Sequence, residues 1–507
     1  MLDRQVSEKR RPDGKRPDRS VEDAKAAALV AELIARARKA QAIANQYDQT
    51  MTDLLVAAAG WAIMEPSRNR ILAELAVGDT GLGNVTDKIQ KNHRKTLGLL
   101  RDLKGAKSVG VIAEHKETGI VEIARPAGVV AAITPSTNPG ATPANKIINA
   151  LKGRNAVILA PSPKGWTTCA KLVEFVHAEL DKLKAPRDLV QLLPAPVTKA
   201  TTHELMRQAD LVVATGSQAN IRAAYASGTP AFGVGAGNVA SIVDRSADLE
   251  PAARQIAVSK CFDNATSCSS ENSLVLDAEI FDAMLDALAR NGGVLLDAKE
   301  RGLLQAALFP DGKLSPELLA KDAPTIAAKA GLDAKRFRSA RFLMVAETGF
   351  GPAHPFSGEK LSPVLAIYRA ANFAEAMRIV ERIYAYQGAG HSVGLHTRKF
   401  GQATELGLAL PVSRVIVNQA HCIATGGSFD NGLPFSLSMG CGTWGRNSFS
   451  DNMNYRHFLN ITRVSHVIPE RMPDEAEIFG EYFARTSPSS RKARAGAGRE
   501  KRRGEER

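Results

Sequence analysis

The sequence predicts an α/β fold made of a doubly wound domain followed by a second α/β domain, and two observations predict it. From Gly128 to about residue 226, short and almost continuous apolar runs alternate with segments of helical periodicity. A second alternation of the same kind follows Ser270. Apolar strands separated by helices are typical of βαβ units, whose parallel sheet is covered on both faces. The composition, 44% hydrophobic and 23% charged over 507 residues, fits a globular chain of two or three domains.

Helices and a hairpin are expected ahead of the first alternation. Residues 21–47 and 50–63 place Ala, Leu, Val and Ile three or four positions apart, which predicts amphipathic helices. Residues 108–125 hold two short β-like runs around a Lys-Glu-Thr-Gly turn and predict a hairpin. A further strand is expected at 457–468, near the end of the fold.

The first alternation predicts a parallel sheet that binds a ligand. Its strands are expected at GVVAAIT, NAVILA, LVQLLP and LVVAT, and its helices at residues 140–151, 165–183, 199–208 and 218–226. Three polar loops, PSTNP, PSPKG and TGSQAN, follow the first, second and fourth strands. Because such sheets bind ligands beyond the carboxyl ends of their strands, we expect these loops to form a site.

The second alternation predicts a separate α/β domain. Its strands are expected at NSLVLD, FLMVAE, VLAIYRA, HSVGLHT and RVIVNQA, and its helices at residues 279–293, 373–386 and 398–408. A charged connecting region extends to about residue 340.

The excess positive charge belongs mostly to the two ends of the chain. Of the net charge of +13, residues 1–20 contribute +3 and residues 485–507 contribute +6. Both ends lack aromatic residues and apolar periodicity, so we expect disordered, solvated extensions rather than a nucleic-acid-binding module. A weak attraction of these ends to RNA, a membrane surface or a protein shell is the alternative.

Cysteine usage and the N-terminal sequence favour the reducing cytoplasm. The N-terminal residues are charged and lack the apolar core of a signal peptide, and no run of about 18 apolar residues occurs. Five cysteines without a C-x-x-C pair argue against a disulfide framework or a zinc ribbon, and the ten histidines form no ligand-spaced cluster. We expect no metal centre and no membrane partner.

Cys268 is the leading candidate nucleophile from the residues alone. It lies in FDNATSCSSENSLVLD, a polar loop of small residues that leads into an apolar strand. Inert cysteines favour apolar surroundings, whereas a reactive thiolate needs access and nearby hydrogen-bond donors. Cys441, in MGCGTWG, is the rival candidate, and Cys169 and Cys422 are expected to be structural.

Seven segments resemble one known family. They occur in the order ITPSTNP, ALKGRNAVILAPSPK, VVATGSQANIRAAYASGTPAFGVGAGN, FDNATSCSSENSLVLD, GEKLSPVLAIYRA, GAGHSVGLHT and SMGCGTWGRNS. Together they resemble the CoA-acylating branch of the aldehyde dehydrogenase superfamily, from about residue 28 to residue 470. Within that branch the chain is most similar to acylating acetaldehyde and sulfoacetaldehyde dehydrogenases.

The resemblance implies an aldehyde dehydrogenase-like fold with a Rossmann-like cofactor domain, an α/β catalytic domain and a small β arm for oligomerisation. The implied division is a disordered basic extension at 1–20, N-terminal helices and a dinucleotide-binding domain at 21–262, a catalytic domain at 263–450, an oligomerisation strand at 451–470 and a disordered basic tail at 485–507. The hairpin at 108–125 would complete the arm. A homodimer or homotetramer is implied.

The resemblance also implies a thioester mechanism with Cys268 as the nucleophile. Its thiolate would attack the aldehyde, and the side-chain amide of Asn138 with the backbone N–H of Cys268 would stabilise the oxyanion. Hydride transfer to NAD or NADP would leave a thioester on Cys268, which the thiol of coenzyme A, the co-substrate, would attack. Cys441 would keep a supporting role.

The implied cofactor site draws on several loops. The helix that follows Ser217 would direct N–H groups at the pyrophosphate. Glu359 would bind the nicotinamide ribose, and Ser162 with Lys164 would lie near the adenosine ribose. The full set of implied cofactor residues is Thr134, Pro135, Ser162, Lys164, Thr215, Gly216, Ser217, Gly235, Gly237 and Glu359. Many family members have a histidine where this chain has Ser162, so NAD and NADP both stay open.

A missing carboxylate implies that CoA, rather than water, takes the acyl group. Hydrolytic aldehyde dehydrogenases carry a glutamate in an E-L-G-G-type motif, and the matching stretch here is GVGAGN at 233–238. The alternative is that Glu271, three residues after the nucleophile, activates water. The chain would then be a hydrolytic dehydrogenase that gives a carboxylic acid.

Sulfoacetaldehyde is the leading expected substrate, because LAVGDTGLG, DKIQKNH and LKGAKSVGVIAEHKETGI look most like the sulfoacetaldehyde enzymes. Acetaldehyde or another short aldehyde is the alternative. Arg446 is the candidate partner of a sulfonate, and His391 is a candidate pocket residue. A non-catalytic binding protein that uses its basic ends is a further alternative. Recruitment to a microcompartment shell is disfavoured, since residues 1–20 lack the amphipathic helix that such targeting needs.

Overall fold

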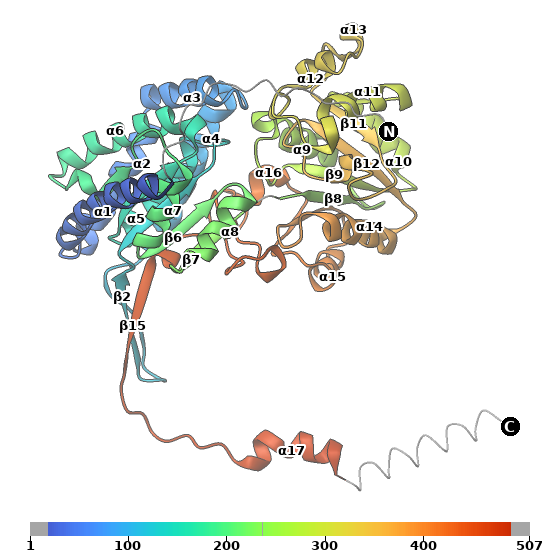
Figure 1. The fold of residues 1–507 in the computed structure, drawn as a ribbon. Coiled ribbons are helices and arrows are strands. Elements are labelled where there is room, and N and C mark those ends of the chain that lie inside the picture. Colours follow the sequence, from blue (N-terminus) through green and yellow to red (C-terminus); the bar gives the residue numbers. More distant parts are fainter. Residues whose placement is uncertain (1–18, 236, 488–507) are drawn as a thin grey trace, which may run out of the picture. The chain divides into compact units, whose positions relative to one another are not determined.

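The computed structural model describes residues 19–235 and 237–487 (Figure 1). Two compact units divide this part of the chain. The first extends through Gly110 and from Ala124 to Ile461, and the second comprises Val111–Ile123 with the residues from Thr462 onward. The first unit holds both parallel sheets, so every site residue described below belongs to it.

A five-stranded parallel sheet occupies the N-terminal half, in the order β5-β4-β3-β6-β7. Its strands are β3 (Val129–Thr134), β4 (Ala156–Pro161), β5 (Val190–Leu192), β6 (Leu211–Thr215) and β7 (Ala231–Val234). The chain builds outward from β3 to β5, then returns to place β6 on the other side of β3. This reversal confirms the doubly wound sheet and makes the carboxyl ends of β3 and β6 the expected ligand site.

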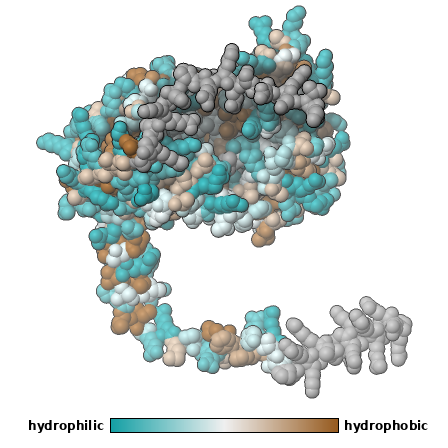
Figure 2. All heavy atoms as spheres, in the orientation of Figure 1, coloured by the Kyte–Doolittle hydropathy of each residue, from teal (hydrophilic) through white to brown (hydrophobic). Residues whose placement is uncertain are grey.

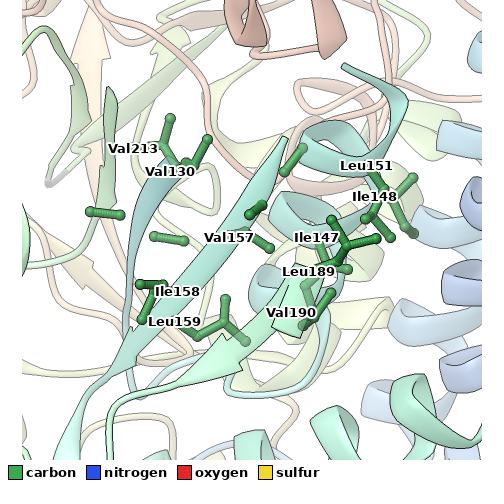
Figure 3. Close-up of a cluster of buried hydrophobic side chains, with 14 of the residues drawn as sticks. Val130, Ile147, Ile148, Leu151, Val157, Ile158, Leu159, Leu189, Val190 and Val213 are labelled. Atoms are coloured by element: carbon green, nitrogen blue, oxygen red, sulfur yellow. The ribbon is translucent and has the colours of Figure 1, made fainter. Parts of the chain in front are cut away.

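The helices that connect these strands lie where the sequence predicts them. They are α5 (Ala141–Lys152), α6 (Trp166–Lys182), α7 (Lys199–Gln208) and α8 (Gln218–Ala226). Two preceding helices, α1 (Arg19–Ala44) and α2 (Gln49–Met64), pack against them, α1 on α7 and α2 on α5 and α6. Figure 3 shows aliphatic side chains of β3, β4 and α5 meeting in the core that results, among them Val130, Ile158 and Ile148. The uninterrupted apolar strands are thus buried on both faces.

Two further helices of this half, α3 (Pro66–Thr80) and α4 (Val85–Leu103), are not among the predicted elements. The buried face of α4 explains why, because it carries Lys88, Lys91 and Lys95 where a periodicity argument looks for apolar residues. The start of α4 has an ordinary cause: the Asn84 side chain accepts a hydrogen bond from the Asp87 N–H.

A seven-stranded parallel sheet forms the second half, in the order β10-β11-β12-β9-β8-β13-β14. Its strands are β8 (Val239–Val243), β9 (Glu271–Asp277), β10 (Gly293–Leu295), β11 (Phe342–Ala346), β12 (Val364–Ala370), β13 (Val393–His396) and β14 (Val415–Val417). The chain therefore passes from one sheet to the other between β7 and β8. The boundary at residue 262 between the dinucleotide-binding domain and the catalytic domain remains a prediction.

The second half holds the helices α9 (Leu249–Cys261), α10 (Phe281–Arg290), α11 (Ala298–Leu308), α12 (Ala323–Lys329), α13 (Ala334–Phe337), α14 (Phe373–Tyr386), α15 (Gly401–Ala409) and α16 (His421–Ala424). Three of them, α11, α12 and α13, lie in the charged connecting region. The first helix of the connecting region, α11, begins with a capping box between Asp297 and Glu300. This polar signal specifies a helix start that the apolar pattern alone does not reveal.

A three-stranded sheet spans the second unit and its junctions, in the order β1-β2-β15. Its strands are β1 (Gly110–His115), β2 (Ile120–Pro126) and β15 (Leu459–Ser465), where the sequence predicts a hairpin and a late strand. One more helix, α17 (Glu475–Thr486), follows and exposes Ile478, Phe479, Tyr482 and Phe483. Figure 2 shows apolar and polar side chains next to one another along it.

The expected disordered ends lie almost wholly outside the described residues, since these begin at residue 19 and stop at residue 487. The last turn of α17 occupies the first residues of the expected tail. Within the part of the chain that is described, no helix is both long enough and apolar enough to cross a membrane.

Candidate active site

The loop that carries Cys268 is held by a buried charge cluster. A short 3₁₀ segment, Phe262–Ala265, ends α9, and its residues Asp263, Asn264 and Ala265 all have φ between 50° and 59°. Left-handed conformations cost about 1 kcal/mol or more per non-glycine residue. The Asp263 carboxylate offsets this cost, because it is fully buried and accepts hydrogen bonds from Lys88 at 3.0 Å and Lys91 at 2.5 Å.

The charges in this cluster act on one another. Burial works to raise the pKa of Asp263, but Lys91 and Lys88 outweigh it and hold that pKa below its usual value. Burial lowers the pKa of Lys88 to about 8. The cluster therefore keeps an ionised carboxylate directly ahead of the nucleophile loop, where it anchors the turn before Cys268.

Cys268 is paired with His391. The Cys268 Sγ lies 3.4 Å from the His391 Nε2, and the other ring nitrogen of His391 lies 2.7 Å from the Ser392 hydroxyl. Burial raises the pKa of the Cys268 thiol, and the Glu359 carboxylate adds to the rise. Burial lowers the pKa of His391 to about 3. A neutral thiol therefore faces a neutral imidazole, and the thiol proton has an acceptor within reach.

Asn138 presents its amide to the same place in a fixed orientation. The Lys91 ammonium donates to the Asn138 Oδ1 at 2.9 Å and also to the Thr266 hydroxyl at 3.1 Å. An ammonium has donors only, so the carbonyl end of the amide must face it. The Asn138 NH₂ group is thereby left to donate elsewhere, and its nearest protein contact is the Thr137 hydroxyl at 3.5 Å.

A cavity of about 370 Å³ lies at the carboxyl ends of β3 and β6 and reaches Cys268. It brings together ten of the residues singled out from the sequence: Thr134, Pro135, Asn138, Ser162, Thr215, Gly216, Ser217, Gly235, Cys268 and Glu359. The expected crevice between the two strands is therefore present, and the nucleophile lines it.

Four other candidates lie outside this lining. Gly237 and His391 are packed behind Cys268, and a Cβ at Gly237 would collide with the Cys268 carbonyl oxygen. Lys164 and Arg446 are exposed, and neither is among the residues that line the cavity. The structure thus brings His391 to the nucleophile and does not bring Arg446 to it.

The cavity has features that fit a dinucleotide. Ser217 caps α8, which directs the N-terminus of that helix at the cavity edge. The Thr134 hydroxyl is buried and has no hydrogen-bond partner within the protein. Glu359 accepts a hydrogen bond from the Gly237 N–H at 3.2 Å, and burial raises its pKa to about 8. A glutamic acid that is protonated near neutral pH can donate to a ribose hydroxyl.

Glu271, the alternative water-activating acid, is held elsewhere. It is fully buried at the start of β9 and accepts a hydrogen bond from the Ser259 hydroxyl at 2.5 Å. Glu359 is the one carboxylate among the described residues that line the cavity. Glu271 is therefore not among the residues that line the cavity on which Cys268 lies.

The remaining cysteines have packing roles in the described structure. Cys441 is buried, its thiol donates to the Met439 carbonyl at 3.5 Å, and burial raises its pKa to about 11. Burial likewise raises the pKa of the Cys169 and Cys422 thiols. All five cysteines are free thiols.

Sequence reasoning missed the Lys91 contact with Asn138 and the ion pairs of Asp263. The available signal was the spacing of Lys88, Lys91 and Lys95, which puts three lysines on one face of a helix. Such a stripe is usually solvated, and nothing local distinguishes a buried one.

Comparisons with known proteins identify relatives of this chain. The sequence profile of the aldehyde dehydrogenase family matches residues 5–292. An acylating sulfoacetaldehyde dehydrogenase of Cupriavidus necator is 65% identical over 466 residues, which is 92% of this chain and 94% of that protein. An acylating sulfoacetaldehyde dehydrogenase of Bilophila wadsworthia is 42% identical over 460 residues, with 90% and 98% covered.

A solved structure is similar over nearly the same length. The acetylating aldehyde dehydrogenase of Geobacillus thermoglucosidasius superposes with a TM-score of 0.85 at 33% identity, over 90% of this chain and 99% of that one. The extent of these matches, together with the cysteine loop and its cavity, leads to one conclusion. The chain belongs to the aldehyde dehydrogenase family, in its CoA-acylating branch.

Proposed function

We propose that this chain oxidises sulfoacetaldehyde with NAD(P)⁺ and transfers the acyl group to CoA. The observation that carries the proposal is the position of Cys268 on a cavity that it shares with Asn138 and Glu359, with His391 at 3.4 Å. The substrate is taken from relatives named acylating sulfoacetaldehyde dehydrogenase, one of them 65% identical. Acetaldehyde remains the alternative substrate.

The first step forms a bond between Cys268 and the carbonyl carbon of the aldehyde. His391 Nε2 accepts the thiol proton as the carbon–sulfur bond forms, so no free thiolate has to form in the buried site beforehand. The negative charge moves to the former carbonyl oxygen. The NH₂ group of Asn138, oriented by Lys91, donates to that oxygen.

The cofactor would be held by Thr134, the N-terminus of α8 and Glu359. When bound there, NAD(P)⁺ supplies the hydride acceptor for the oxidation of the Cys268 thiohemiacetal to a thioester. Ser162 lines the cavity and Lys164, two residues further along the chain, is exposed, an arrangement compatible with either NAD or NADP.

The thioester then reacts with a thiol rather than with water, because neither candidate position supplies a general base for water. The stretch GVGAGN at 233–238, which by its resemblance matches the glutamate-bearing motif of hydrolytic aldehyde dehydrogenases, has no carboxylate, and Glu271 is bonded to Ser259 and does not line the cavity. Once the thioester has formed, His391 releases to solvent the proton that it took from Cys268, which is the proton that the overall oxidation gives off. As the CoA thiol attacks the carbonyl, His391 can then take its proton and pass it to the departing Cys268 sulfur.

Steady-state assays test this function. NAD(P)H formation is measured with sulfoacetaldehyde and with acetaldehyde, each with and without CoA, for the wild type and for Cys268→Ala. The proposal predicts turnover that requires CoA, favours sulfoacetaldehyde and is absent in the variant. Equal turnover without CoA would support the hydrolytic alternative instead.

We also propose that the protein is a cytoplasmic homodimer or homotetramer that associates through the β1-β2-β15 sheet. This small sheet leaves apolar side chains exposed, including Val111 at 45% and Val464 at 39%. Free thiols at all five cysteines suit a reducing compartment. Light scattering on the full chain and on the Val464→Lys variant tests this association. The proposal predicts that the variant has a lower molar mass in solution than the wild type.

A further inference from the structure

A second cavity, of about 320 Å³, adjoins the nucleophile loop on another side. Asn138, Ser267 and Leu437 line both this cavity and the first one. Ser267 directly precedes Cys268, so a molecule in the second cavity can approach the nucleophile past these shared residues. We call this second space the α4 cavity, because four residues of α4 line it: Gln90, Lys91, Arg94 and Lys95.

The lining of the α4 cavity has an excess of positive charge. Lys91, Arg94 and Lys95 face it, and Asp430 is the one carboxylate among the described residues of the lining. Lys91 forms an ion pair with the buried Asp263 carboxylate, and burial lowers the pKa of Lys95 to about 7. Arg94 is therefore the cation of this lining that most favours an anionic ligand, since the local dielectric constant of a partly enclosed space is lower than that of water.

Two of these three cations have their donors occupied. The Lys95 ammonium donates to the carbonyl oxygens of Ile423, Gly426 and Gly427, each at 3.0 Å. The Lys91 ammonium donates to Asn138, Asp263 and Thr266. Neither side chain has a further N–H to offer to a ligand.

Arg94 differs from both lysines. Its Nη2 donates to the Ser428 hydroxyl at 2.7 Å, and its guanidinium lies over the Phe429 ring at 4.9 Å. Its Nε is buried and has no hydrogen-bond partner. The Ser428 hydroxyl in turn donates to Asp430, which ties that carboxylate to the same group. Arg94 is therefore fixed by Ser428 and Phe429 while it lines the cavity, as a recognition residue should be.

We propose that the α4 cavity binds the anionic end of the substrate and that Arg94 is the residue that recognises it. The proposal rests on the function proposed above and names the specificity residue for it. A short aldehyde with a sulfonate or carboxylate would place its anion at Arg94 and its carbonyl at Asn138 and Cys268. Acetaldehyde would fill the same path and leave Arg94 without an anionic partner.

The test compares two aldehydes in two variants. In Arg94→Gln, kcat/KM for sulfoacetaldehyde should fall about 10- to 100-fold, mostly through KM, because a charge-assisted hydrogen bond is lost. The value for acetaldehyde should not fall, since acetaldehyde has no anion to bind. Arg94→Lys, which keeps the charge, should recover part of the loss. Arg70→Gln is the matched control, because Arg70 is exposed and lines a neighbouring cavity but not this one.

Each other result overturns the assignment. An equal loss for both aldehydes would mean that Arg94 only supports the structure, and no loss would place the anion elsewhere. Failure of the proposed function has a different signature, namely a wild type that turns over acetaldehyde with CoA but not sulfoacetaldehyde. Should Arg94→Gln not fold, isethionate, which has the sulfonate but no aldehyde, must compete with acetaldehyde in the wild type. If it does not compete, the subsite is absent.

Discussion

The ammonium of Lys91 lies 2.9 Å from the amide oxygen of Asn138, so a helix near the start of the chain orients a group beside Cys268. Lys91 is in turn fixed by Asp263, which stands five residues before the nucleophile. The amide and the cysteine loop are thus held by one buried ion pair. Orientation before reaction is what makes a hydrogen-bond donor effective toward a developing oxyanion.

Replacing Asn138 tests the amide directly. Asn138→Ala should lower kcat about 10²–10³-fold, the usual cost of losing one oxyanion donor. The KM for the aldehyde should change much less, because the donor acts mainly on the transition state. Steady-state kinetics with saturating CoA and NAD(P)⁺ measure both values. A change confined to KM would contradict the assigned role.

Replacing Lys91 tests whether it acts through Asn138. Lys91→Met should lower kcat, yet it should have little further effect in the Asn138→Ala background, because coupled residues give non-additive losses. Lys88→Met is the matched control, since Lys88 also contacts Asp263 but not Asn138. Additive losses in the double variant would show that Lys91 supports the loop alone.

Replacing His391 should change the pH profile as well as the rate. His391→Gln should lower kcat about 10²–10⁴-fold, the range for a lost general base. Because burial raises the pKa of Cys268, the residual rate should keep rising with pH as the thiolate forms without help. His396→Gln, at a buried histidine in the same strand region, serves as the control. A residual rate that does not depend on pH would exclude His391 as the proton acceptor.

Glu359 should make the stability of the fold depend on pH. Its pKa is about 8 in the folded protein, against an ordinary value of 4.5 for a solvated glutamic acid, so the folded state binds this proton more tightly. Stability contributed by the proton is full below pH 4.5 and is lost as pH rises through 8. At about 1.4 kcal/mol per pKa unit the effect is of the order of a few kcal/mol.

The variant Glu359→Gln removes that dependence. It should melt higher than the wild type above pH 8, and the difference should shrink toward pH 4.5. Thermal unfolding across this range measures it. A constant difference between the two proteins would mean that Glu359 is already ionised in the folded state at neutral pH.

Local sequence signals predicted the alternating parts of the fold well. The helix expected at 373–386 matches α14, and those at 199–208 and 218–226 match α7 and α8. These segments succeed because their buried faces are apolar, so burial and periodicity carry the same information. In α4 the buried face includes Lys88, Lys91 and Lys95, and the same argument fails.

The site was predictable where its residues lie in recognisable motifs, including His391 behind the lining. Asn138, Cys268 and Glu359 come from three distant loops, and the resemblance named each of them. The contact between Lys91 and Asp263 joins residues 172 positions apart, and neither has a local pattern that signals it. Arg446 was chosen for its charge beside a glycine-rich motif, whereas the arginine on a cavity next to Cys268 is Arg94.

The central claim is that the acyl group on Cys268 leaves to CoA and not to water. Rapid mixing of the enzyme with sulfoacetaldehyde and NAD(P)⁺ in the absence of CoA measures it most directly. The account predicts a burst of about one NAD(P)H per active site that then stalls, with turnover resuming when CoA is added. Continuous NAD(P)H formation without CoA would contradict it.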